Sequence, residues 1–192
     1  MLDVYKIRED FPILSKKVNN TDLIYFDNAA TSQTPNQVID VISNYYKEYN
    51  SNIHRGLHSL STDATDKYEN SRTIIKNHFG ASHEHEIIFT SGTTHGINII
   101  SSGLEKMITS KDELIVSEME HHSNIVPWQM LCEKTGSKLK VIPINDDGTL
   151  NITEFKVLLT PNVKFVFINH VSNTLGTINP IKEIIDLSHE NN

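Results

Sequence analysis

The stretch "EIIFTSGTTHGIN", residues 86–98, decides how the chain is organised. Apolar β-formers fill its first part and stop at the small hydroxylated residues and the glycine of 90–94. Beyond them, apolar residues recur at the spacing of a helix. The stretch therefore predicts a strand over 86–90 that turns directly into a helix over 93–106. A helix that begins in this way offers free backbone N–H groups and several hydroxyls to a ligand.

Strands and helices alternate along the rest of the chain. Further strands are expected over 113–117, 138–142 and 163–168, with a turn at Asp147-Gly148. The helices between and after them are expected at 127–134, from a start at Thr153, and from about Pro180. Strands separated by helices need crossover connections, so the sequence predicts an α/β fold with a mainly parallel sheet and helices on both faces.

Two helices are also expected before the opening stretch, after a short apolar run at 23–26. Thr34-Pro35 is typical of an N-cap followed by a first helical residue. The next helix should run from about Ser61 to Phe79 and end at Gly80 as its C-cap. The first of the two helices should bury an apolar stripe formed by Val38, Val41, Ile42, Tyr45 and Tyr49.

Polar segments follow three of the expected strands, at 91–95, 118–124 and 169–176. Ligands of parallel sheets bind beyond the carboxyl ends of the strands. The first segment could seat a phosphate, or its Ser and Thr could equally be ordinary N-caps. The second holds two adjacent histidines, which do not point the same way, so one ring could face a planar ligand and no metal site is expected. These histidines could equally be surface or structural residues, and the third segment could donate amides to an anionic oxygen or form a simple turn.

The three segments together describe one site. Neighbouring strand ends would bring a phosphate seat, an imidazole and an amide donor into one crevice. Such a crevice suits a flat, phosphorylated cofactor that bears a phenolate, and pyridoxal 5′-phosphate (PLP) is such a molecule.

The composition limits the possible functions. The chain has 192 residues, of which 38% are hydrophobic, and a formal net charge of −7. This acidic balance without a basic face speaks against binding to nucleic acid or to a membrane surface. Cys132 is the single cysteine, which excludes an internal disulfide framework, and the charged start 1–10 does not fit a signal peptide. A cytoplasmic protein is expected, with a small molecule or another protein as its partner.

Five motifs, in this order, resemble the class V aminotransferase family, and most of all its SufS-type cysteine desulfurases and selenocysteine lyases. They are "YFDNAATSQTP" (25–35), "NIHRGLHSLS" (52–61), "FTSGTTHGIN" (89–98), "EMEHHSNIVPWQML" (118–131) and "HVSNTLGTINPI" (170–181). The resemblance implies PLP-dependent fold type I and a homodimer. It also implies removal of sulfur from L-cysteine, or of selenium from L-selenocysteine, with L-cysteine yielding L-alanine and a persulfide that a sulfur-acceptor protein receives for iron–sulfur cluster assembly.

The resemblance assigns cofactor roles to four residues. Thr93 and Thr94 match the turn that binds the phosphate of PLP. His121 matches the histidine that stacks on the pyridine ring and assists proton transfer, which makes it the candidate catalytic residue. Asn173 matches the asparagine that contacts the ring hydroxyl of the cofactor.

Other residues match the surroundings of the substrate. Ala29 and Ala30 match a segment that borders the substrate pocket. His54 and Arg55 match a loop near the active site and the dimer interface, although a solvated basic loop is the alternative. Cys132 does not match the persulfide cysteine of the family, and a buried structural thiol is the expected role.

The family places further catalytic groups later in its sequence. These are the lysine that binds PLP covalently, the aspartate that pairs with the pyridine nitrogen, the catalytic cysteine and the arginine for the substrate carboxylate. The expected organisation is a leader at 1–20 and the N-terminal part of the PLP-binding large domain at 21–192, as a fragment that is inactive alone. The alternatives are another class V enzyme, such as a selenocysteine lyase or a kynureninase-like hydrolase, or a non-catalytic remnant that acts as a binding module.

Overall fold

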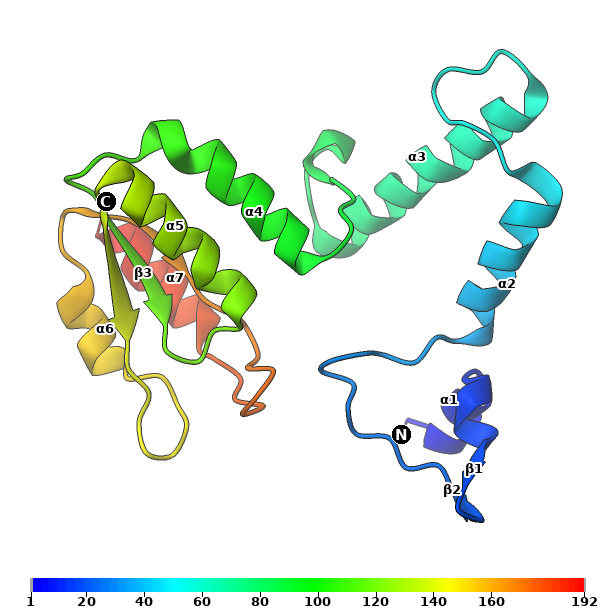
Figure 1. Cartoon of the computed structure of the whole chain (residues 1–192), viewed down its shortest axis with the longest axis horizontal. Coiled ribbons are helices and arrows are strands. Elements are labelled where there is room, and N and C mark those ends of the chain that lie inside the picture. Colours follow the sequence, from blue (N-terminus) through cyan, green and yellow to red (C-terminus); the bar gives the residue numbers. More distant parts are fainter. Residues whose placement is uncertain (1, 192) are drawn as a thin grey trace. The chain divides into compact units, whose positions relative to one another are not determined.

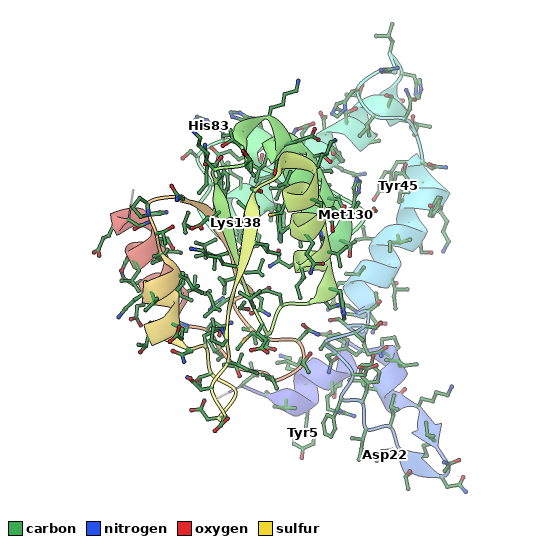
Figure 2. All side chains as sticks on the ribbon, turned by 60° about the vertical axis from the view of Figure 1, so that its left-hand side comes forward. Tyr5, Asp22, Tyr45, His83, Met130 and Lys138 are labelled. Atoms are coloured by element: carbon green, nitrogen blue, oxygen red, sulfur yellow. The ribbon has the colours of Figure 1, made fainter. Side chains whose placement is uncertain are left out.

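The computed structural model describes residues 2–191, so Met1 and Asn192, the outer bounds of the expected segments, lie outside the described residues. The chain divides into two compact units, Met1–Phe89 and Thr90–Asn192, and each is described by itself. Figure 1 shows the ribbon, and Figure 2 shows the side chains on it, with Met130 on α5 (Val126–Thr135) and Lys138 at the start of β4 (Lys138–Ile142).

The first unit is mainly helical. A short antiparallel hairpin, β1 (Lys17–Val18) and β2 (Thr21–Asp22), turns through Asn19 and Asn20, whose φ angles are 51° and 63°. Asparagine accepts this left-handed backbone, which two-residue hairpin turns require. The helical elements are α1 (Val4–Glu9), η1 (Pro12–Ser15), α2 (Asn36–Asn44), η2 (Tyr45–Tyr49), α3 (Ser59–Phe79) and η3 (Glu84–Glu86).

The long helix α3 confirms the expected helix and its stop signal. It begins two residues earlier than expected, at Ser59, and Gly80 follows it with a φ of 70°. The Gly80 N–H donates to the carbonyl of Lys76, which satisfies one of the last free carbonyls of the helix. A residue with a Cβ would be strained in this left-handed conformation, so glycine ends the helix here.

Two expectations for the first unit are wrong. Pro35, and not Thr34, is the N-cap of α2, and it makes no side-chain capping bond because proline has no polar side chain. The expected buried stripe of this helix is largely exposed, with Val41 and Ile42 both more than half accessible. Amphipathic spacing shows which face of a helix is apolar, but burial needs an element that packs on that face.

The second unit contains a three-stranded parallel sheet with the order β4-β3-β5. The predicted parallel sheet is therefore confirmed, and Ser117 pairs with Ile142 while Val116 pairs with Phe167. Its elements are α4 (Thr93–Leu104), η4 (Glu105–Met107), β3 (Glu113–Ser117), η5 (His122–Asn124), α5 (Val126–Thr135), β4 (Lys138–Ile142), α6 (Ile152–Leu158), β5 (Val163–Phe167) and α7 (Ile181–Glu190).

Helices cover both faces of this sheet, as expected (Figure 1). Leu114 and Val116 face α4 and α5, where Trp128 and Leu131 are buried against them. Ile115 faces the opposite way, into a core with Phe155 of α6 and Ile184 of α7. Successive residues of a strand point to opposite faces, so one five-residue strand supplies both cores.

The expected strand at 86–90 is not formed. Ile87 has extended backbone, but in residues 2–191 this segment pairs with no strand, and Ile88 is 72% exposed. β-Propensity describes how a side chain fits a pleated, half-buried surface, and a strand forms only beside a partner. The helix expected after it is present as α4, although its last residues form the tighter turn η4.

The remaining boundaries agree with the sequence to within a few residues. The Asp147-Gly148 turn forms, with Gly148 at a φ of 79° and Asp147 Oδ1 accepting from the Thr149 N–H at 3.0 Å. Helix α6 begins at Ile152 because Asn151 is its N-cap, which corrects the expected start at Thr153. Within the described part of the chain, no helix is long and apolar enough to cross a bilayer.

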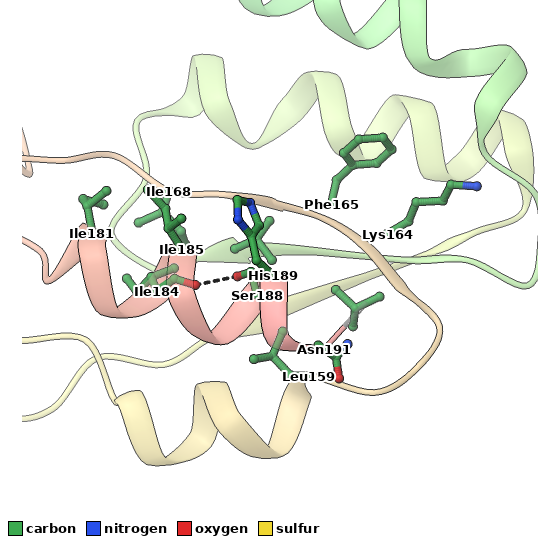
Figure 3. Close-up of a pocket in the computed structure, with 12 residues that line it drawn as sticks. Leu159, Lys164, Phe165, Ile168, Ile181, Ile184, Ile185, Ser188, His189 and Asn191 are labelled. Atoms are coloured by element: carbon green, nitrogen blue, oxygen red, sulfur yellow. Dashed lines mark hydrogen bonds between the residues drawn. The ribbon is translucent and has the colours of Figure 1, made fainter.

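Strand β5 forms one outer edge of the sheet, and a pocket of about 520 Å³ lies between it and α7. Figure 3 shows Ile181, Ile184 and Ile185 of this helix beside Ile168. The Ser188 hydroxyl donates to the carbonyl of Ile184 at 2.6 Å, so this polar group is satisfied within the helix. The side chains that line the pocket are mainly apolar.

We expect Phe155→Ala to lower the free energy of unfolding by about 3–5 kcal/mol, since Phe155 is fully buried and its removal leaves a cavity. Val157→Ala on the same helix is the control, because Val157 is 69% exposed and should change stability by less than about 0.5 kcal/mol. Urea denaturation of both variants measures the difference. Equal losses would contradict the packing described for this face.

Candidate active site

Helix α4 begins without a capping side chain. Its N-cap is Gly92, which has a φ of 141° and a ψ of 172° and makes no side-chain hydrogen bond to the helix. The N–H groups of the first turn therefore stay free, since they have no acceptor within the helix. Thr93 and Thr94 are exposed, and neither hydroxyl forms a hydrogen bond inside residues 2–191. This helix is therefore not capped by a Ser or Thr side chain, which was the alternative interpretation of the segment.

The preceding residues hold the turn in shape. The Thr90 hydroxyl donates to the carbonyl of Gly92 at 3.1 Å. The Ser91 N–H donates to Nδ1 of His95 at 3.3 Å, and the Ser91 hydroxyl lies 3.0 Å from the same nitrogen. These contacts use the polar groups before Thr93 and leave those of the first helical turn available to an anion, which the positive end of the helix dipole also favours.

His121 lies beyond the carboxyl end of β3 and is the N-cap of η5. Its Nδ1 accepts from the Ser123 N–H at 3.1 Å, so the neutral ring carries its proton on Nε2. The rings of His121 and His122 are 6.3 Å apart and inclined at 85°. The two side chains therefore present different faces, as the sequence suggested.

Glu120 is a buried carboxylate that the sequence reasoning missed. It is only 8% exposed and accepts from the Ser117 hydroxyl at 2.6 Å and the Asn169 N–H at 2.8 Å on one oxygen. The Asn124 amide donates to its second oxygen at 2.7 Å. The sequence signal that could have identified it is its spacing beyond the end of a buried strand, three residues after Ser117 and four before Asn124.

Asn173 lies in the loop that follows β5. The loop is closed by a bridge between Val171 and Ile178 and by the buried hydroxyl of Ser172, which accepts from the Leu175 N–H at 3.1 Å. The exposed Asn173 amide donates to Thr174 Oγ1 at 3.3 Å. Its carbonyl oxygen has no protein partner within the described chain, so most of its hydrogen-bonding capacity is free.

The parallel sheet brings the candidate residues of the second unit to one end. Strands β3 and β5 are neighbours, so the segments after them, which carry His121 and Asn173, leave the sheet at the same edge. Helix α4, which begins at Thr93, packs against η5. The imidazole of His121 and the exposed amide of Asn173 thus lie at this end of the sheet, and the helix that packs against η5 begins with free N–H groups.

The other candidate residues belong to the first unit. Ala29 and Ala30 lie in an exposed turn, where the Ala30 N–H donates to the carbonyl of Asp27 at 3.2 Å. His54 has a φ of 65°, and its Nε2 lies 2.7 Å from a carboxylate oxygen of Glu69, a partner that the sequence reasoning did not identify. Arg55, next to it, is exposed.

Cys132 has the structural role expected for it. It is buried in the core beside Trp128 and Leu131. Burial raises the pKa of its thiol, which disfavours the thiolate needed for nucleophilic chemistry.

Comparison with known proteins places these features in a family. The family model described as aminotransferase class-V matches residues 24–192. A probable cysteine desulfurase of Mycolicibacterium paratuberculosis is 47% identical over 190 residues, and one of Halalkalibacterium halodurans is 45% identical over 189 residues. Each alignment covers 98% of this chain, but only 28% and 47% of the respective relatives.

A solved structure gives the same result for the fold. The apo structure of a cysteine desulfurase from Thermococcus onnurineus NA1 superposes with a TM-score of 0.90 at 37% sequence identity. The superposition covers 100% of this chain and 46% of that protein. The predicted fold class is therefore confirmed.

We expect Gly92→Ala to lower the free energy of unfolding by about 1–3 kcal/mol, because its φ of 141° is strained for any residue with a Cβ. The added methyl would meet no atom within 4 Å, so the loss would come from the backbone alone. Gly103→Ala in the same helix is the control and should raise stability by about 0.5–1 kcal/mol, since its site is also open. Losses of the same size in both variants, measured by urea denaturation, would refute this account of the turn.

Proposed function

The chain belongs to the class V aminotransferase family, and from this membership we propose that it carries part of the active site of a PLP-dependent cysteine desulfurase. The proposed reaction converts L-cysteine to L-alanine and passes the sulfur, as a persulfide, to an acceptor protein. The observation that carries the proposal is the open N-terminus of α4, a helix that packs against η5, the turn that follows the carboxyl end of β3.

The α4 turn fits the phosphate of PLP. A phosphate dianion needs several donors, and this turn supplies free N–H groups, two unused hydroxyls on Thr93 and Thr94, and the positive end of the helix dipole. Gly92 has no side chain, and a Cβ at its position would point into open space, so nothing on this residue blocks the approach of an anion.

His121 and Asn173 would hold the ring of the cofactor. Ser123 fixes one edge of the His121 imidazole through Nδ1, which leaves the ring faces and the Nε2 proton available. A flat aromatic ring of this kind can stack on a pyridine ring and can hold or donate a proton at Nε2. The amide of Asn173 can donate to an anionic ring oxygen.

Bound PLP supplies the electron sink that labilises the bonds at the α-carbon of an amino-acid substrate. The residues of this chain would bind the phosphate and orient the ring, and His121 would hold or donate a proton at Nε2. Ala29 and Ala30 would leave room for a small amino acid, and His54 and Arg55 are proposed to lie near the substrate. A homodimer located in the cytoplasm is part of the same proposal.

We expect the double variant Thr93→Val/Thr94→Val to bind PLP more weakly, by about tenfold for each hydroxyl that donates to the phosphate. Equilibrium dialysis with PLP measures the affinity, and inorganic phosphate should compete with the cofactor. Thr153→Val is the matched control, because Thr153 lies in the first turn of α6, where Asn151 already caps the helix.

Pyridoxal, which lacks the phosphate, separates this seat from other binding. It should bind much more weakly than PLP to the unaltered chain and equally to all variants. If PLP and pyridoxal bind the unaltered chain with the same affinity, the α4 turn is not the phosphate seat.

In a preparation of this protein that turns over L-cysteine, we expect His121→Ala to lower kcat about 10²- to 10⁴-fold if Nε2 moves a proton. His122→Ala is the matched control and should change kcat only a few-fold, because its ring is turned 85° from that of His121. Alanine and sulfide formation are the measurements.

Two results would count against the assignment. Equal and small effects of the two substitutions would show that His121 has another role. Binding of PLP without turnover of L-cysteine would refute the desulfurase assignment, while membership of the family would still hold. Turnover of L-selenocysteine in the same assay would then identify a selenocysteine lyase.

A further inference from the structure

Glu120 sits at the centre of a hydrogen-bond network that joins three parts of the second unit. Ser117 ends β3, Asn169 follows β5, and Asn124 lies at the entrance to α5. All three donate to the Glu120 carboxylate, over 2.6 Å, 2.8 Å and 2.7 Å respectively. No other charged side chain contacts this carboxylate within residues 2–191, so neutral donors alone compensate its burial.

The direction of the hydrogen bonds requires a carboxylate at this position. The indole N–H of Trp128 donates to Asn124 Oδ1 at 2.9 Å, which turns the amide nitrogen of Asn124 toward Glu120. At the other end, the backbone N–H of Asn169 can only donate. Both fixed ends of the chain of bonds are donors, so the group between them must accept from both sides, and an ionised carboxylate is acceptor-only.

We propose that Glu120 is a positioning residue that fixes the backbone from which His121 is presented. His121 is the next residue, and its carbonyl accepts from the N–H of Asn124 at 2.7 Å, so the network closes around it. The same carboxylate holds Asn169, where the loop that carries Asn173 begins. Glu120 acts through these hydrogen bonds, and its consequence for cofactor binding rests on the proposed function.

Two single variants and their combination test the network. Glu120→Gln places an amide nitrogen opposite either the Asn124 amide or the Asn169 N–H, so one donor is left without an acceptor. Asn124→Asp places a second carboxylate against Glu120. The double variant Glu120→Gln/Asn124→Asp keeps the size and the total charge of the pair. It also restores every bond, because the amide introduced at position 120 then donates to the carboxylate introduced at position 124, which still accepts from Trp128.

Amide hydrogen exchange of the full chain reads out local order. We expect Glu120→Gln to lower protection about tenfold to a hundredfold in 118–124 and 169–176, while β3 keeps its protection. The double variant should return both segments to the unaltered level. Glu133→Gln is the matched control, because Glu133 is an exposed residue of α5, and it should change nothing.

A merely stabilising role predicts a different pattern. If protection falls by the same factor in β3 and in both segments, or if the double variant does not restore it, the proposal is overturned. Should Glu120→Gln fail to fold, a folded double variant with full protection supports the proposal, and an unfolded one refutes it.

Dialysis of the same variants against PLP separates this inference from the proposed function. PLP affinity that falls in Glu120→Gln and returns in the double variant supports both. Restored protection without any PLP binding by the unaltered chain leaves the positioning of 118–124 and 169–176 in place and refutes the proposed phosphate seat.

Discussion

Strand β3 is buried on both faces, and this constraint determines where most helices and strands of the second unit lie. Because its residues from Leu114 to Ser117 have almost no contact with solvent, apolar helices must cover each side. Two short neighbouring strands then satisfy its backbone groups. The carboxyl end of such a strand opens where the helices no longer cover it, so polar groups can gather at that edge.

At that edge the polar side chains divide into two sets. Ser117, Glu120 and Asn124 are bonded to one another or to the backbone, and they form a closed scaffold. The hydroxyls of Thr93 and Thr94 and the side-chain oxygen of Asn173 keep unused hydrogen-bonding capacity. A ligand site needs both sets, since binding groups are effective only when their support has no alternative conformation of similar energy.

Much of the second unit follows from the sequence, because its signals are local. Short apolar runs and helical apolar spacing located the strands and helices around β3, and the glycines after α3 and in the 147–148 turn have the backbone angles that favour glycine. The segment 86–90 has equally strong β-formers and forms no strand. Its residues have a preference for strands, whereas pairing depends on a neighbouring strand that the local sequence does not specify.

The candidate site was likewise predicted in part. Thr93, His121 and Asn173 belong to polar segments that follow apolar runs, and the general rule for parallel sheets points to such segments from the sequence alone. Glu120 was passed over because no periodicity marks a buried carboxylate, and only the surrounding donors explain why a charge is tolerated there.

Trp128 is the only tryptophan of the chain, and its indole stacks on Phe167 with ring centres 3.6 Å apart while its N–H reaches Asn124. The chain thus contains a single tryptophan fluorophore, whose ring contacts Phe167 of β5 and whose N–H contacts the hydrogen-bonded scaffold. Because the indole is only 1% exposed, its emission arises from one shielded environment, and a change in colour or intensity of that light would report movement at the strand ends without any added label.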